Sequence, residues 1–276
     1  MCIEVIRLGK QPVFFDIDGT LLDYQIGIND ILPSCRHSLD RLRQSHPAFI
    51  ASGRTKCFIV DEILNYPFDG FVTCNGAYVE YKGQCIYKKA ISKTAISHAL
   101  QVADALGAVL YLESHDCIYV HHAHLPSHAI FAEKWRMHDH IVVTDFDPAT
   151  IEVYIGMIIA PDEKSCAYIE ETLQADFDVS RHVRQRSFDL TLKGENKAKG
   201  IAEVAKYLDV PMSEIFAFGD GNNDMEMISQ VGYGIAMGNA VAPLKAVAYD
   251  VTDTVANDGI TKALLKYGLI EGENEK

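Results

Sequence analysis

Residues 13–23 read VFFDIDGTLLD, a short apolar run that leads into two carboxylates and a glycine. Such a run is typical of a strand buried on both faces of a parallel sheet. Asp16 and Asp18 follow it, at the edge of the sheet where open α/β folds bind their ligands. Two buried acids this close need a cation or specific hydrogen bonds, so the stretch predicts a divalent metal and a carboxylate that could attack phosphorus. Two alternatives stay open: the acids only cap a turn, or they belong to a phospho-accepting receiver domain.

The segments around this strand extend it into a sheet that alternates with helices. Apolar positions recur at helical spacing after Pro33, and Phe49–Ala51 supplies a second buried strand, which closes a βαβ unit. Strands and helices alternate again from Lys197 onward, whereas residues 85–190 carry a self-contained α+β pattern. The sequence therefore predicts an α/β fold with a Rossmann-like, doubly wound parallel sheet that an inserted α+β domain interrupts. The expected bounds are residues 1–81 and 192–276 for the core and residues 82–191 for the insertion.

A second polar loop follows the strand Phe49–Ala51. Ser52, Gly53 and Arg54 come next and lead into a helix expected over residues 55–64. A hydroxyl and free backbone N–H groups at a helix N-terminus can hold a phosphate. An ordinary serine helix cap is the alternative for Ser52, and this signal alone is weak.

A third polar loop repeats the arrangement near the end of the chain. Asp220 and Asp224 follow the apolar run Phe216–Phe218, so they can face the same point as Asp16. Oxygen-rich ligation with no cysteine or histidine pattern nearby suits Mg²⁺ better than zinc. Three polar loops at strand ends, two of them acidic, favour a shared site over separate helix caps.

Composition limits the function classes. The 276 residues include 25 basic and 38 acidic side chains, a formal net charge of −13, which opposes binding to nucleic acid or anionic lipid by bulk electrostatics. Seven widely spaced cysteines without a CxxC pair favour reduced thiols over a disulfide framework or a zinc ribbon. The N-terminus lacks an apolar signal region, and the longest apolar stretch, Ile155–Ala160, is too short for a membrane helix. We expect a cytoplasmic protein without a nucleic-acid, membrane or obligate protein partner.

Three motifs together resemble those of the haloacid dehalogenase (HAD) superfamily of phosphohydrolases. They are FFDIDGTLLD from Phe14, ASGR from Ala51 and FGDGNNDMEM from Phe218, which look like motifs I, II and IV of that superfamily. Motif III should be a lysine upstream of motif IV. Counting back from the sequence LDV at residues 208–210 places Lys197 there. Lys199 is the rival, which we expect to be a solvated helix residue.

The inserted domain carries the resemblance further. Because it lies between motifs II and III, the chain resembles the subgroup with a type C2 cap. Residues 73–77, TCNGA, and residues 231–240, VGYGIAMGNA, look like the Cof-type branch of that subgroup. Asn75 and Gly76 are therefore possible substrate contacts. The cap matches in size and position but shows no specificity signature.

The resemblance implies a role for each motif residue. Asp16 would be the nucleophile that forms an aspartyl phosphate, and Asp18 the general acid and base. Mg²⁺ would bind Asp16, the backbone carbonyl of Asp18, and Asp220, with Asp224 in support. Arg54 would either contact substrate or form a structural ion pair. The residues expected to hold the transferring phosphoryl group are Ser52, Gly53, Lys197 and Asn223.

The expected function is that of a Mg²⁺-dependent phosphatase whose cap closes over a small phosphorylated metabolite, such as a sugar phosphate or a phosphorylated cofactor. A phosphotransferase or phosphomutase on the same core is the alternative, with a second hydroxyl intercepting the aspartyl phosphate. A non-catalytic receiver-like binding module is a further alternative. Asp18 beside Asp16 argues against the binding module, because an acid/base neighbour promotes loss of the phosphoryl group.

Histidines are concentrated in the cap. Seven of the eleven fall between His115 and His140, and His121, His122 and His124 are nearly contiguous. In an extended segment His122 and His124 share one face while His121 points away. No carboxylate or cysteine nearby in the sequence completes a ligand set, so substrate contact by one of them is favoured over a zinc or iron site.

Two other features of the cap are interpreted as structural. Arg181, His182, Arg184 and Arg186 form a locally basic stretch, favoured as a solvated loop over an attractor of anionic substrate. Trp135 follows the spacing of a helix expected over residues 127–137 and is expected in the core.

Overall fold

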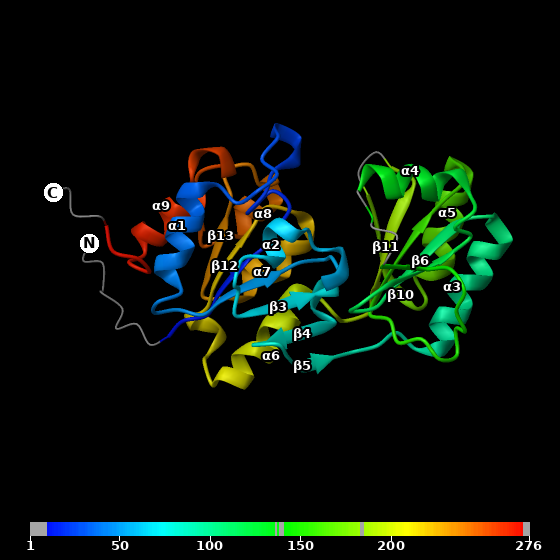
Figure 1. Cartoon of the computed structure of the whole chain (residues 1–276), viewed down its shortest axis with the longest axis horizontal. Helices are drawn as coiled ribbons and strands as arrows, with labels where there is room; N and C mark the ends of the chain where they lie inside the picture. The colour runs from blue at the N-terminus through cyan, green and yellow to red at the C-terminus, as the bar shows by residue number, and fades with distance from the viewer. Residues whose placement is uncertain (1–9, 136, 138–140, 183–184, 273–276) are drawn as a thin grey trace.

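The chain is built around two β-sheets, one in each of the two bodies seen in Figure 1. This computed structural model describes residues 10–135, 137, 141–182 and 185–272. The N-terminal segment 1–9, His138, His140 and Arg184, which entered the sequence predictions, lie outside the described residues. The chain enters the second body after strand β5 and leaves it after strand β11, so the second body is an insertion into the first.

The larger sheet has the order β14-β13-β12-β1-β2-β3-β4-β5. The first six strands in this order are parallel, and helices connect them, so the expected doubly wound sheet is confirmed. The side chains of β1 are fully buried because the strand lies between β12 and β2 in the middle of the sheet. The strands are β1 (Val13–Phe15), β2 (Ala48–Ala51), β3 (Gly70–Thr73), β4 (Tyr78–Tyr81), β5 (Gln84–Lys88), β12 (Phe216–Gly219), β13 (Tyr233–Ala236) and β14 (Asp250–Val251).

Helices pack around this sheet in two groups. Helix α1 contacts α9, while α7 contacts both α6 and α8. Helix α6 also packs on β3, β4 and β5, which brings its first turn close to the loop after β3. The bounds are α1 (Pro33–Leu42), α2 (Asp61–Leu64), α6 (Lys197–Leu208), α7 (Met225–Gln230), α8 (Ala242–Val247) and α9 (Gly259–Lys266).

The hairpin of β4 and β5 belongs to the larger sheet. Strand β4 pairs antiparallel with β3, and β5 pairs antiparallel with β4. The boundary expected after residue 81 divides this hairpin, because the periodic pattern of the sequence changes there. Backbone hydrogen bonding keeps the two strands in one sheet, so we propose that the core continues through Lys88.

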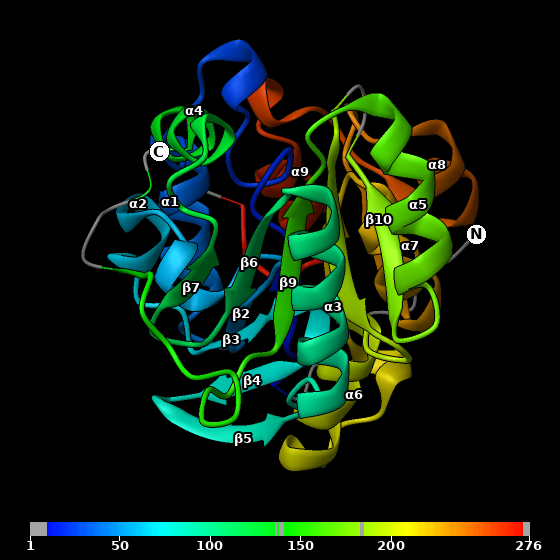
Figure 2. The same cartoon turned by 90° about the vertical axis from the view of Figure 1, so that its right-hand side faces the viewer.

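The second sheet has the order β10-β11-β9-β6-β7-β8 and is antiparallel except for the pair β7 and β8. Helices α3 and α5 cover the face turned away from the core, which is the near face in Figure 2. None of the described helices has both the length and the apolar character that crossing a bilayer requires. The elements are α3 (Lys93–Leu106), β6 (Val109–Glu113), β7 (Ile118–His121), α4 (Pro126–Lys134), β8 (Val142–Val143), β9 (Ile155–Ile159), α5 (Glu163–Leu173), β10 (Phe177–Arg181) and β11 (Ser187–Leu192).

The central strand β6 serves two apolar clusters at once. Leu110 and Leu112 pack with α3 and α5, whereas Val109 and Tyr111 pack on the opposite face with Phe58 of the core. This division follows from the two-residue period of a strand. Strands β8 and β10 were not expected from the sequence. They lie at the sheet edges, and β10 buries only Phe177 completely, so neither carries a strong apolar pattern.

The helix expected over residues 55–64 is instead divided into a 3₁₀ turn, Lys56–Phe58, and the short helix α2. The backbone is extended at Ile59 between them. The N–H of Cys57 donates to the carbonyl oxygen of His115 in the cap, at 3.2 Å. This bond to the cap satisfies the N–H of Cys57, which therefore needs no partner within a helix. The sequence of the segment alone could not reveal this contact.

Candidate active site

Strand β1 carries Asp16 to the centre of the candidate site. The strand ends at Phe15, and the N–H of Asp16 donates to the carbonyl oxygen of Phe218 in the neighbouring β12, at 3.0 Å. Asp16 is buried. The loop then turns at Gly19, where φ is 88° and a Cβ would lie 2.1 Å from Oδ2 of Asp220. Only glycine allows this approach, so the loops after β1 and β12 meet there.

Lys197, in the first turn of α6, is fully buried among these acids. Its Nζ lies 2.6 Å from Oδ1 of Asp16 and 2.6 Å from Oδ1 of Asp224. The rival Lys199 points elsewhere, with Nζ 2.5 Å from Oε1 of Glu195. The structure therefore brings Lys197, and not Lys199, to the two carboxylates.

Asp224 organises the loop after β12. Its Oδ2 accepts hydrogen bonds from the backbone N–H groups of Asp220 and Gly221, each at 2.9 Å. One carboxylate oxygen from each of Asp16, Asp220 and Asp224 lies within 4.8 Å of the other two. An all-oxygen set of this kind is what Mg²⁺ binds in proteins, so the residues present fit the expected ion.

The electrostatics of the cluster suit a divalent cation. Burial raises the pKa of Asp16 well above its usual range; Lys197 opposes the shift, and the neighbouring acids add to it. Burial and Asp224 raise the pKa of Asp220 to about 7. Lys197 stays charged, because Asp16 and Asp224 raise its pKa by more than burial lowers it. When Asp16, Asp220 and Asp224 are ionised and Lys197 is charged, the cluster has a net charge of about −2. A divalent cation would neutralise it.

Asp18 has different surroundings although only one residue separates it from Asp16. Arg54 donates from Nε to Oδ2 of Asp18 at 2.9 Å and from Nη2 to Oδ1 at 2.6 Å. The Asp18 side chain is 43% exposed. The structure thus gives Arg54 an ion pair, one of its two expected roles. The Arg54 guanidinium also lies 5.6 and 5.7 Å from the ring centres of Phe58 and Trp135, so Trp135 lies beside the site instead of deep in the core.

The loop after β2 lies between two amide side chains. Oγ of the buried Ser52 accepts a hydrogen bond from the N–H of Arg54, at 3.2 Å. A Cβ added to Gly53 would lie 3.1 Å from Oδ1 of Asn75 and 3.5 Å from Nδ2 of Asn223. Glycine therefore keeps this loop open toward both amides. Of the four expected phosphate-binding residues, Ser52 and Gly53 lie on the loop after β2, Asn223 lies in a 3₁₀ turn after β12, and Lys197 begins α6.

Asn75 and Gly76 follow β3 and meet different neighbours. Asn75 donates from Nδ2 to Oγ1 of Thr191 in the cap strand β11, at 3.1 Å. Its Oδ1 is buried without a hydrogen-bond partner among the residues described. A Cβ on Gly76 would lie 2.0 Å from the carbonyl oxygen of Asn196, directly before Lys197. Gly76 thus sets the approach of this loop to α6, whereas Asn75 has a polar atom to offer a ligand.

Sequence reasoning missed Glu113, the last residue of β6. Burial, with a contribution from Asp189, raises the pKa of Glu113 to about 8, while Arg54 opposes the shift. A signal was present: Glu113 lies two residues after Tyr111 and shares its strand face, which is turned toward the core. An acid on that face of an apolar strand marks the side of the cap that meets the site.

Two further contacts support the site and were also missed. Asn239 donates from Nδ2 to the carbonyl oxygen of Gly19 at 2.7 Å and accepts from the N–H of Val255 at 3.3 Å. Thr55 donates from its hydroxyl to the carbonyl oxygen of Ser114 in the cap. The first contact holds the loop after β1, and the second joins the loop after β2 to the cap. Asn239 lies in the segment that resembles the Cof-type branch, but that resemblance names no role for it.

Comparison with known proteins identifies the family of this chain. The model of the family described as haloacid dehalogenase-like hydrolase matches residues 13–264. The Bacillus subtilis (strain 168) protein named "Putative phosphatase YkrA" is 35% identical over 266 residues, which cover 96% of this chain and 100% of that protein. The 5-amino-6-(5-phospho-D-ribitylamino)uracil phosphatase YitU of the same organism is 26% identical, covering 92% of this chain and 96% of YitU.

A solved structure extends the likeness to the cap. The HAD subclass IIB sugar phosphatase BT4131 matches with a TM-score of 0.81 at 28% identity, covering 94% of this chain and 100% of that one. The match therefore includes both sheets and not the core alone. The chain belongs to the haloacid dehalogenase-like hydrolase family, as a phosphatase of its Cof-type branch with a C2 cap.

Proposed function

We propose that this chain is a Mg²⁺-dependent phosphatase that hydrolyses a small phosphorylated metabolite, a sugar phosphate or a phosphorylated cofactor, through an aspartyl phosphate on Asp16. The observation that carries the proposal is the contact of one buried lysine, Lys197, with both Asp16 and Asp224. The ammonium group of Lys197 favours the ionised form of Asp16 against the effect of burial and holds the side chain in position at the end of β1. A carboxylate in that state is a competent nucleophile.

In the first step, Oδ2 of Asp16 attacks the phosphorus atom and the ester oxygen leaves. We assign the attack to Oδ2 because Oδ1 is the atom bonded to Lys197. Asp18 protonates the departing oxygen. In the second step, Asp18 takes a proton from water, the water oxygen attacks phosphorus, and the Asp16 carboxylate and inorganic phosphate are released. The half-exposed position of Asp18 allows it to reach a leaving group that enters from the cap side.

The metal and the phosphate would share the acidic loops. Asp16, Asp220 and the backbone carbonyl of Asp18 would hold Mg²⁺, supported by Asp224. The ion supplies the positive charge that lets an anionic nucleophile approach an anionic phosphate. Lys197 stabilises charge on the transferring phosphoryl oxygens, together with three groups on the facing loops, which are Ser52, the backbone at Gly53 and Asn223.

The organic part of the substrate would be read by the cap and by the loop after β3. Asn75 offers a buried oxygen without a partner, and Glu113 offers a buried carboxyl group whose pKa of about 8 keeps it protonated at neutral pH. An unpaired acceptor and a carboxyl donor suit a leaving group rich in hydroxyls. The substrates in the names of YitU and BT4131 are a phosphorylated ribitylamino compound and sugar phosphates. Both agree with this chemistry.

The proposal places the protein in the cytoplasm, with a small phosphate ester as its partner and with no nucleic-acid, membrane or obligate protein partner. The net charge of −13 supports the first two exclusions. The six cysteines among the described residues are free thiols, as expected in a reducing compartment.

The test is phosphate release from a panel of sugar phosphates and phosphorylated cofactors, with Mg²⁺ or EDTA, followed over many turnovers. The proposal expects multiple turnover that needs Mg²⁺ and is lost in Asp16→Asn. A second arm adds an acceptor alcohol: phosphoryl transfer to it at the expense of phosphate release would replace the hydrolase by a phosphotransferase. Stoichiometric labelling without turnover would replace it by a receiver-like module.

A further inference from the structure

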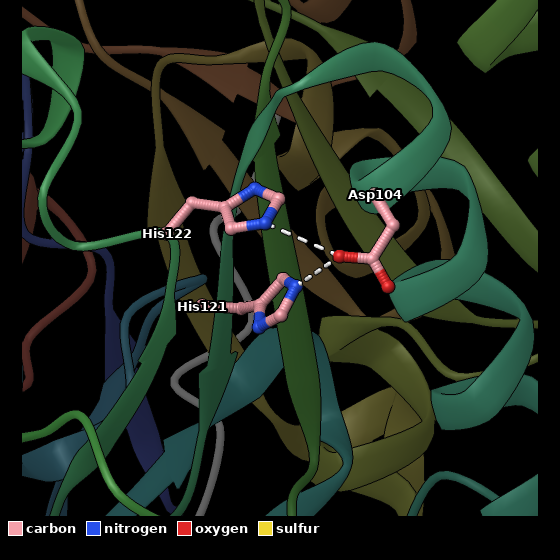
Figure 3. A group of neighbouring side chains, drawn as sticks. All are labelled: Asp104, His121 and His122. Atoms are coloured by element: carbon pink, nitrogen blue, oxygen red, sulfur yellow. Dashed lines mark hydrogen bonds and ion pairs between the residues drawn. The ribbon is translucent and has the colours of Figure 1, made fainter.

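The cap carries a group of metal-ligating side chains that the proposed catalysis does not use. Asp104 lies in the last turn of α3, His121 ends β7, and His122 follows it. Figure 3 shows both imidazole rings turned toward one carboxylate oxygen. Nε2 of His121 lies 2.7 Å from Oδ1 of Asp104, and Nε2 of His122 lies 3.2 Å from the same atom. The two rings stack with their centres 4.0 Å apart.

The backbone explains why the sequence did not predict this arrangement. Alternation along a strand places His121 and His122 on opposite sides, and no acid lies nearby in the sequence. The strand ends at His121, however, and His122 has a φ of 61°, which turns its ring to the same side. The missing carboxylate comes from Asp104, seventeen residues earlier in the chain. The expectation of an incomplete ligand set was therefore wrong.

The hydrogen bonds of His122 orient its ring as a metal ligand is oriented. Its Nδ1 lies 2.8 Å from the carbonyl oxygen of Ala108, which can only accept, so Nδ1 carries a proton. In the neutral ring Nε2 then presents a lone pair, and it faces Oδ1 of Asp104, another acceptor. Two acceptors at this distance need a positive charge between them or on the imidazole. A histidine that donates one N–H to a carbonyl and offers the other nitrogen is the usual arrangement of a metal ligand.

We propose that Asp104, His121 and His122 form a binding site for Zn²⁺ or a similar divalent transition metal, separate from the Mg²⁺ site of the core. One ligand atom from each side chain lies within 4.8 Å of the others. Two imidazoles and one carboxylate form a typical zinc set, whereas Mg²⁺ favours oxygen ligands. The ring of His124 lies 5.6 Å from that of His122, so this exposed side chain or a water can complete four-coordination.

A metal here would fasten together segments that lead to the core. It would tie the end of α3 to the end of β7 and to the turn before α4. Helix α4 carries Phe131, whose ring lies 6.4 Å from that of Phe58 in the core, and ends beside Trp135, which lies over Arg54. The site is thus placed to stiffen the part of the cap that contacts the catalytic loops.

The experiment is a Zn²⁺ titration of the full chain in excess Mg²⁺, which occupies the oxygen-lined core site, followed by calorimetry. We expect one Zn²⁺ per chain. We also expect Asp104→Asn and His122→Asn each to weaken Zn²⁺ binding more than tenfold, since each removes a ligand. Asparagine tolerates the φ of His122, and Asp104 is 60% exposed, so both variants should fold.

The matched control is His98→Gln, which removes another histidine of α3. Nδ1 of His98 lies 2.5 Å from Oδ2 of Asp176, but the described part of the chain offers this pair no third ligand. This variant should bind Zn²⁺ as the unaltered chain does. Co²⁺ should in addition give a visible absorption band that Asp104→Asn abolishes. Absence of a Zn²⁺ equivalent in excess Mg²⁺, or binding that both ligand variants retain, would overturn the proposal and leave a simple imidazolium–carboxylate pair.

Discussion

The core and the cap assemble their charged groups in different ways. In the core, each loop contributes residues close together in the sequence, such as Asp16 with Asp18 and Asp220 with Asp224, and the ends of parallel strands bring the loops together. In the cap, Glu113 is set by the register of one strand, and the Asp104 cluster joins the end of a helix to a left-handed residue. The core site can therefore be recognised from short motifs, whereas the cap sites depend on contacts between distant segments.

The largest effect should come from the core nucleophile. Asp16→Asn keeps the shape of the side chain but removes the attacking carboxylate, so turnover should fall at least about 10⁴-fold. Steady-state phosphate release measures the loss. The matched variant is Glu113→Gln, an equally conservative change in the cap, which should retain most of kcat and raise KM. Equal losses of kcat in Asp16→Asn and Glu113→Gln would contradict the assignment of catalysis to the core and of substrate binding to the cap.

The second core carboxylate should separate the two chemical steps. Asp18→Asn removes the acid and base but leaves Asp16 and its contact with Lys197, so turnover should fall about 10²–10⁴-fold. With a substrate whose leaving group needs no proton, the phosphorylated chain should accumulate. Rapid quenching followed by mass measurement of the intact protein detects it. A phosphorylated species absent from Asp18→Asn and present in Asp16→Asn would contradict the assignment of the nucleophile.

The third effect concerns stability. Lys197→Met leaves Asp16 and Asp224 buried without their shared cation, which should cost roughly 3–5 kcal/mol of unfolding free energy. Urea unfolding without metal measures the cost. Lys199→Met is the control and should cost less, because the Lys199 side chain is 43% exposed and the buried Glu195 keeps its hydrogen bond from the Tyr87 hydroxyl. Similar losses for both lysines would contradict the placement of Lys197 at the centre of the core site.

The last effect is a pH dependence that belongs to the cap. The pKa of Glu113 is about 8 in the folded chain, against about 4.3 for an unfolded glutamate. Between these values the folded chain binds the extra proton, so a rise in pH through this window lowers the unfolding free energy. Glu113→Gln should flatten this fall.

The comparison is made by urea unfolding of both proteins from pH 5 to pH 9 in excess Mg²⁺, which keeps the protonation of the core acids out of the difference. An identical pH slope for the two proteins would mean that Glu113 is not held protonated by burial.

The sequence predicted the doubly wound sheet, the insertion and the convergence of Asp16, Lys197, Asp220 and Asp224. The sheet and the three aspartates follow from local patterns, because parallel strands end at one edge and each loop follows its strand directly. Lys197 was placed by the resemblance to motif III alone. The broken helix at residues 55–64 was out of reach, since its backbone bonds to a cap segment distant in the sequence. The Arg54 pair with Asp18 was left open because the sequence does not determine whether a side chain after β2 turns to the neighbouring core loop or to a ligand.

The cap was harder to predict for a second reason. Its edge strands bury few side chains, and the turn at His122 reverses a ring that regular alternation places elsewhere. Glu113, by contrast, could have been found from the two-residue period of β6. Register within one strand is local information, whereas the direction of a ring after a left-handed residue is not.

The alternation of β6 also bears on how such a protein can evolve. Substitutions at Val109, Tyr111 and Glu113 alter the surface that meets the core, while those at Leu110 and Leu112 alter the packing of the cap helices. Neighbouring codons are therefore under different selective pressures. One set affects which substrate binds, and the other affects the stability of the cap. Deletion of a single codon in this strand would exchange the two roles, so a lineage can drift in specificity by point mutation but not by changes in strand length.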